Sequence, residues 1–160
     1  MTAKDNESPI GSKILSILFG IGTISGIEKL QDDGEDFFVV EYGEKNVKNY
    51  SPMGEKKKIR FVSSEEVFTK SLKRLKQKTE EKKFPAKKDR ISYFNTILRE
   101  CSLDEIVSKV IEVNSISDLA VNEKDKLKKL LKTLEQEASI IYTLTSPKSK
   151  DFVSKYLGTE

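Results

Sequence analysis

This sequence has no histidine, no tryptophan and only one cysteine among its 160 residues. Histidine is the commonest general base and a frequent metal ligand, so its absence argues against acid–base catalysis and against a zinc site. Cys101 has no histidine to activate it as a nucleophile, and we expect it to be a small buried side chain. The sequence therefore predicts no catalytic residue, no metal ligand and no enzymatic activity.

Long hydrophobic runs are also missing. The longest apolar stretch, residues 14–27, is interrupted by serines and three glycines and is too short to span a bilayer. Residues 1–9 include acidic side chains where a signal peptide would be basic and then apolar. A lone cysteine cannot form an internal disulfide, and it suits a reducing compartment. We therefore expect a cytoplasmic protein without a membrane partner.

Charge is distributed unevenly along the chain. The net charge is only +3, yet residues 1–70 hold 10 basic and 12 acidic side chains, whereas residues 71–160 hold 19 and 14. The excess is densest in residues 73–90, where nine basic side chains face three acidic ones. A local positive field of this kind attracts phosphates or an acidic surface.

The first half of the sequence is typical of short strands. Runs rich in Ile, Val, Phe and Tyr occupy residues 14–19, 23–29, 36–42, 47–50 and 58–62, and turn residues follow each run. Asp33-Gly34 between two such runs indicates a hairpin. Five short antiparallel strands predict a small five-stranded barrel of the SH3 or Tudor kind, which we assign to a domain of residues 1–70.

The second half is typical of helices. Residues that favour a helix start are Ser63 with Glu66, Ser102 with Glu105, Asn122, and Ser146 before Pro147. Apolar residues follow at helical spacing, and the charged segment 76–88 reads as a linker. Four amphipathic helices with short connections predict a compact all-α bundle. The fold class is therefore α+β in two small domains, the second covering residues 71–160.

The basic segment 73–90 has two interpretations. Its lysines could reach a phosphate backbone, with Phe84 acting as an apolar wedge in the minor groove. In the second interpretation it is a solvated linker with Phe84 packed on the helical bundle. The sequence leaves both interpretations open.

Several short motifs occur in a fixed order over both halves of the chain. They are GIGTISGIE at residues 20–28, FFVV at 37–40, Ser51-Pro52, LDEIVSKVIE at 103–112 and NEKDKLKKLL at 122–131. This ordered set resembles the CarD/CdnL family of bacterial transcription regulators. The resemblance covers roughly residues 11–157.

The resemblance implies a Tudor-like domain that pairs with the β subunit of RNA polymerase, and a helical domain at the upstream edge of the transcription bubble. Such proteins stabilise the open promoter complex as monomers, without catalysis and without a cofactor. An exposed sheet edge suits this role, because a partner segment can add to it as a further strand. Position by position, the implied polymerase-binding residues are Leu30, Gln31, Asp32, Lys48, Asn49 and Tyr50.

The family commonly wedges a tryptophan into the minor groove at the start of the first bundle helix, and this chain has Lys87 at that position. The implied DNA-binding residues are Lys83, Phe84, Lys87, Lys88 and Arg90. Either Phe84 replaces the tryptophan, or the chain holds promoter DNA by phosphate contacts alone. The absence of a helix-turn-helix signature argues against sequence-specific recognition.

Three functions follow from these patterns. The first is a polymerase-bound regulator that stabilises the open complex through non-specific DNA contact. The second is a polymerase-binding adapter without productive DNA contact, favoured by the missing tryptophan. The third is a free, non-specific DNA-binding protein, favoured by the basic segment but not by the acidic first half.

Overall fold

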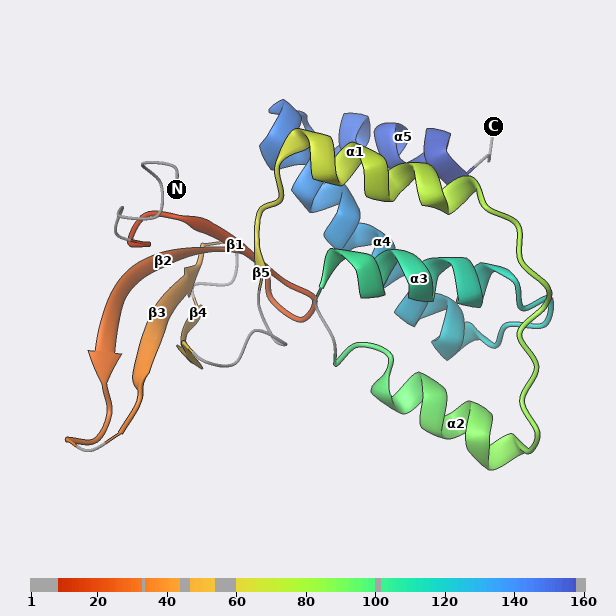
Figure 1. Cartoon of the computed structure of the whole chain (residues 1–160), viewed down its shortest axis with the longest axis horizontal. Coiled ribbons are helices and arrows are strands. Elements are labelled where there is room, and N and C mark those ends of the chain that lie inside the picture. Colours follow the sequence, from red (N-terminus) through yellow and green to blue (C-terminus); the bar gives the residue numbers. More distant parts are fainter. Residues whose placement is uncertain (1–8, 33, 44–46, 54–59, 100–101, 158–160) are drawn as a thin grey trace.

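The structure, a computed structural model, describes residues 9–32, 34–43, 47–53, 60–99 and 102–157. These residues have a mixed α+β fold, with one antiparallel sheet followed by five helices. The sheet lies beside the helical part, and the chain passes from strands to helices near residue 64 (Figure 1).

The five strands are β1 (Lys13–Ser16), β2 (Gly20–Lys29), β3 (Asp36–Tyr42), β4 (Val47–Pro52) and β5 (Arg60–Phe61). Each overlaps a segment predicted from its β-branched and aromatic residues. The antiparallel pairing of β2 with β3 confirms the predicted hairpin, with Lys29 opposite Asp36 at its outer end. Asp33 in the predicted turn, and the lysines at 56–58, lie outside the described residues.

The described strands form an open sheet, so the prediction of a closed barrel is wrong. The strand order is β4-β3-β2-β1-β5, which leaves β4 and β5 at opposite edges. Closure requires the two edge strands to pair, and the described part of β5 is two residues long. A register shift between Ile24 and Gly26 in β2 is a bulge, which bends the sheet without closing it.

One face of the sheet carries a small apolar core. Its buried members are Ile14, Ile24, Phe38, Val40 and Tyr42. Gly22 is needed beneath this core, because a Cβ atom there would lie 2.7 Å from side-chain atoms of both Val40 and Tyr42. The glycine therefore permits a close approach that no other residue allows.

The helices are α1 (Glu65–Lys73), a 3-10 turn η2 (Arg74–Lys76), α2 (Lys87–Thr96), α3 (Leu103–Asn114), α4 (Val121–Tyr142) and α5 (Ser146–Leu157). Residues between η2 and α2 form an extended linker, which confirms the expected break in the charged segment. The helical type predicted for this half is confirmed, although the described residues contain five α-helices and four were predicted.

Helix starts were predicted less accurately than the helices themselves. The cap of α3 is confirmed, because the Glu105 amide donates to Ser102 Oγ at 3.2 Å. The cap of α1 is Ser64, one residue after the predicted Ser63. Asn122 lies inside the first turn of α4 and is not its cap, so that prediction is wrong.

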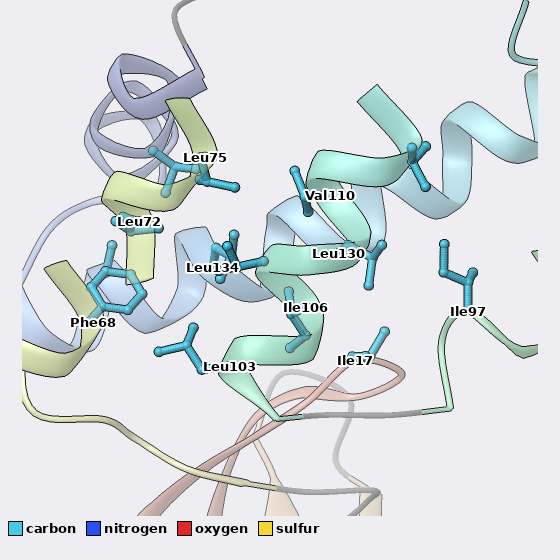
Figure 2. Close-up of a cluster of buried hydrophobic side chains, with 14 of the residues drawn as sticks. Ile17, Phe68, Leu72, Leu75, Ile97, Leu103, Ile106, Val110, Leu130 and Leu134 are labelled. Carbon is cyan, nitrogen blue, oxygen red and sulfur yellow. The ribbon is translucent and has the colours of Figure 1, made fainter. Parts of the chain in front are cut away.

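Figure 2 shows one apolar core shared by α1, α3 and α4, together with the end of α2. Its fully buried members include Phe68, Leu72, Ile106, Val110, Leu130 and Leu134. Ile17, from the turn between β1 and β2, inserts into the same core. Because α1 packs with the later helices, the predicted division after residue 70 falls inside a helix of this core.

Within the described part of the chain, none of the helices has the length and apolar character needed to cross a membrane.

Candidate functional surfaces

Strand β4 forms one edge of the sheet and carries three of the predicted polymerase-binding residues. Lys48 pairs with Glu41 and Tyr50 with Val39, so Lys48 and Tyr50 lie on the same face. Both are exposed, Tyr50 to 39%. Asn49 lies between them on the opposite face. The edge therefore presents an aromatic and a basic side chain together.

Two features of β4 limit hydrogen bonding along its outer edge. The Tyr50 amide donates to Asn49 Oδ1 at 2.9 Å, and Pro52 has no N–H to donate. Natural sheet edges are commonly blunted in this way, because open donors and acceptors invite pairing with another chain. A partner strand that pairs with the Tyr50 amide must therefore displace the Asn49 side chain.

The other predicted polymerase-binding residues lie at the tip of the β2–β3 hairpin. Leu30, Gln31 and Asp32 follow β2 and are all exposed, Leu30 to 54%. In β3, Asp36 is the last residue that pairs with β2, and Val39 is the residue that pairs with Tyr50. Asp36 and Val39 are three positions apart, which corresponds to about 10 Å along a strand. The partners of Lys48 and Asn49 are Glu41 and Val40, so Tyr50 is the member of the β4 group nearest to the hairpin tip.

Three of the predicted DNA-binding residues are exposed lysines. Lys83 lies in the linker, and Lys87 and Lys88 are the first two residues of α2. None of the ion pairs among the described residues involves these three lysines.

Phe84 packs against the protein, as the second interpretation of the basic segment expected. Its ring lies 5.4 Å from that of Tyr93 and 6.5 Å from that of Phe94, measured between ring centroids. The Lys82 ammonium lies over both Phe84 and Tyr93. Burial, and then a hydrogen bond to Glu112, raise the pKa of Tyr93 well above its usual value. Phe84 is therefore part of an aromatic cluster that holds α2.

Arg90 is held by carboxylates of its own chain. Its guanidinium donates to both carboxylate oxygens of Glu123 at 2.9 and 2.7 Å. It also donates to Asp118, at 3.2 Å to Oδ1 and 3.1 Å to the carbonyl oxygen. The bond from Arg90 is the main reason that the pKa of Glu123 lies below its ordinary value. This geometry favours a clamp between α2 and the start of α4 over a phosphate contact.

Lysines of neighbouring helices complete the attachment of α2, a role that the sequence analysis missed. Lys126 Nζ donates to the Phe94 carbonyl and Lys109 Nζ to the Ile97 carbonyl, each at 2.8 Å. These carbonyls belong to the last turn of α2 and its cap, where backbone acceptors lack partners within the helix. Local spacing gives no signal for such contacts, because the lysines lie on α3 and α4.

A buried ion pair joins the sheet to the helices. Arg60 of β5 donates to Glu137 of α4 at 2.7 Å, and the Ser63 amide donates to the same Glu137 oxygen at 2.8 Å. The Glu137 side chain is fully buried and that of Arg60 is 9% exposed. A sequence signal existed, since Glu137 follows Leu134 by three residues and therefore lies on the apolar stripe of the helix.

Nothing in the described residues resembles a metal centre, since no three side chains of His, Cys, Asp or Glu lie together there. Cys101 lies outside the described residues, so its burial stays a prediction. No model of a known protein family matches the chain, and no curated protein matches it either.

Proposed function

We propose that this chain is a non-enzymatic transcription regulator of the CarD type. In this proposal the edge strand β4 and the β2–β3 tip bind the β subunit of RNA polymerase. The helical part then stabilises the open promoter complex through non-specific DNA contact near the upstream edge of the bubble. The protein acts as a cytoplasmic monomer and needs no cofactor.

The exposed edge of β4 is the observation that carries the proposal. Lys48 and Tyr50 lie on one face of a strand that forms the edge of the described sheet. A sheet edge bearing an aromatic anchor is suited to a partner that supplies one further strand. In this proposal the open sheet is a Tudor-like interaction domain, and the helices form a second, DNA-contacting domain.

Replacing Tyr50 with alanine is expected to weaken polymerase binding by about tenfold or more, the effect typical of an aromatic anchor at an interface. The full-length chain is immobilised, and its affinity for the isolated β-subunit lobe is measured by biolayer interferometry. Val67→Ala is the matched control, because Val67 is an exposed apolar residue on α1, at 53%. Equal affinities for the Tyr50 and Val67 variants would remove β4 from the interface.

DNA contact in this proposal depends on exposed lysines alone. Lys83, Lys87 and Lys88 remain available, whereas Phe84 and Arg90 face the protein. Binding should therefore depend strongly on salt and weakly on base sequence.

The double variant Lys87→Ala, Lys88→Ala is expected to reduce the slope of log affinity against log salt by about 2, or about 1 per lost phosphate contact. Fluorescence anisotropy of a labelled forked duplex, titrated at several KCl concentrations, measures the slope. The variant Lys70→Ala, Lys73→Ala removes the same charge from α1 and should leave the slope near that of the wild type. An unchanged slope for the α2 variant would argue against DNA contact there.

A second function, a polymerase-binding adapter without productive DNA contact, has its own support. Phe84 is the candidate wedge, and its ring packs against Tyr93. Arg90 is the arginine of the predicted DNA site, and its guanidinium donates to Glu123. Tyr50-dependent polymerase binding together with an unchanged salt slope would favour this adapter.

A further inference from the structure

A lysine-rimmed groove lies at the end of the helical part away from the sheet. It is formed by η2, the first residues of the linker, α3, α4 and the end of α5, and it is an open hollow of about 940 Å³. Figure 1 places the linker and the end of α5 together on this side of the molecule. The residues that line the groove include none from β4 and neither Lys87 nor Lys88.

The floor of the groove is apolar. It is built from side chains of four different elements, namely Leu75, Ile111, Leu131 and Leu157. Leu75 belongs to the buried core at 7% exposure, and the other three are partly buried against that core. Partly exposed aliphatic side chains at the base of a concave surface favour an apolar group from a partner, because its burial removes apolar area from water on both sides.

The rim of the groove is positively charged. Lys76, Lys78 and Lys155 line it and are exposed, and no carboxylate is among the described residues that line it. The Lys76 ammonium lies 5.7 Å from the centre of the Tyr156 ring, which holds it beside the end of α5. None of the ion pairs among the described residues uses these three lysines. Their charge is therefore available to a partner.

One wall of the groove is extended backbone. Gln77, Lys78 and Thr79 line it and belong to no helix or strand. Gln77 has φ −67° and ψ 129°, which is extended geometry. An extended wall suits a peptide ligand, because peptide segments pair with one another through their backbones.

We propose that the lysine-rimmed groove binds an acidic peptide segment of a partner protein, anchored by one large apolar side chain. The carboxylates pair with the three lysines, and the apolar side chain covers the leucine and isoleucine floor. Nucleic acid fits less well, because a phosphate backbone matches the rim but supplies no aliphatic group for the floor. This contact would add a protein partner to the polymerase and DNA contacts proposed above, and it does not depend on them.

A peptide-display experiment tests the proposal on the full-length chain. A random 12-residue library is selected on the wild type, and the enriched peptides are then measured by fluorescence anisotropy. Peptides rich in Asp and Glu around a Leu, Ile, Phe or Trp are expected. The charge-reversed variant Lys78→Glu, Lys155→Glu should bind them about tenfold more weakly, because each pair is lost and replaced by repulsion. Both lysines are exposed, so the fold should tolerate the change.

Three controls decide the outcome. Lys83→Glu, Lys87→Glu makes the same charge change outside the groove and should bind the peptides as the wild type does. A chain ending at Leu157 tests whether the last three residues affect the site. Methyl NMR signals of Ile111 and Leu131 should shift on peptide addition. Failure to enrich acidic peptides, equal binding by both charge-reversed variants, or displacement of the peptide by duplex DNA would each overturn the proposal.

Discussion

Replacing Glu137 with alanine is expected to lower the free energy of unfolding by about 3–5 kcal/mol, the usual cost of removing one partner of a buried ion pair. The Glu137 side chain is fully buried, and the Arg60 guanidinium beside it is nearly so. Without the carboxylate, Arg60 keeps a buried charge with no counter-charge, and the Ser63 amide loses its acceptor. Urea denaturation followed by circular dichroism measures the change.

Two further variants separate the ion pair from the effect of a shortened side chain. Asp104→Ala removes an ion pair of similar length, 2.6 Å to Arg74, and its cost should be below about 1 kcal/mol because Asp104 is exposed. The double variant Arg60→Met, Glu137→Leu removes both charges and should recover most of the lost stability. A loss below about 1 kcal/mol for Glu137→Ala would contradict the importance of this pair.

This ion pair also bears on the proposed function, because it joins the sheet, which carries one candidate surface, to the helices, which carry the other. Arg60 belongs to β5 at one edge of the sheet, and Glu137 belongs to the long helix α4. Ile17 makes a second connection by inserting the β1–β2 turn into the helical core (Figure 2). With the sheet and helices joined in this way, a partner that holds β4 also sets the position of Lys87 and Lys88.

Features that depend on neighbouring residues in the sequence were predicted well. Strand β3 has the bounds predicted from its run of Phe, Val and Tyr residues, 36–42. The cap at Ser102 was found because its spacing to Glu105 is a property of the helix start itself. The apolar stripe of α4, including Leu130 and Leu134, was likewise read from its period.

Features that depend on distant residues were missed or mistaken. Barrel closure depends on whether two strand edges meet, and strand count alone does not determine that. The α1 cap shifted from Ser63 to Ser64, and the Ser63 amide is bonded to Glu137, 74 residues away. Arg90 was predicted to bind DNA, but its guanidinium donates to Glu123 and Asp118. No local sequence pattern connects these two residues to Arg90. Side chains with long-range partners are therefore the least predictable part of the candidate site.

Replacing Arg90 with alanine is expected to lower the free energy of unfolding by about 1–3 kcal/mol, because several charge-assisted hydrogen bonds are lost at a partly buried site. The side chains of Arg90 and Glu123 are only 24% and 10% exposed. The same substitution should leave the salt slope of DNA binding unchanged, since the guanidinium faces the protein. Urea denaturation and anisotropy titrations on the same preparation measure both quantities.

Lys88→Ala is the matched control, because Lys88 lies two residues away on α2 but is exposed. Its stability should change by less than about 0.5 kcal/mol, while its salt slope should fall by about 1. If Arg90 contacts DNA instead, Arg90→Ala will behave like Lys88→Ala. Its free energy of unfolding will be nearly unchanged, and the salt slope of its DNA binding will be reduced. Each of the two residues thus has a distinct expected result in each measurement.

Acid titration provides an independent check of the Arg90 clamp. Because Arg90 holds the pKa of Glu123 below its ordinary value, the pair adds stability above the pKa of an unfolded glutamate, about 4.3. That stability is lost as the pH falls through the lower pKa of the folded state. The difference between the wild type and Arg90→Ala should therefore be full at neutral pH and shrink below about pH 4. The Arg90 guanidinium also lies 5.9 Å from the centre of the Phe84 ring. A difference that stays constant down to pH 3 would mean that Arg90 stabilises the fold through this ring contact and not through the carboxylate.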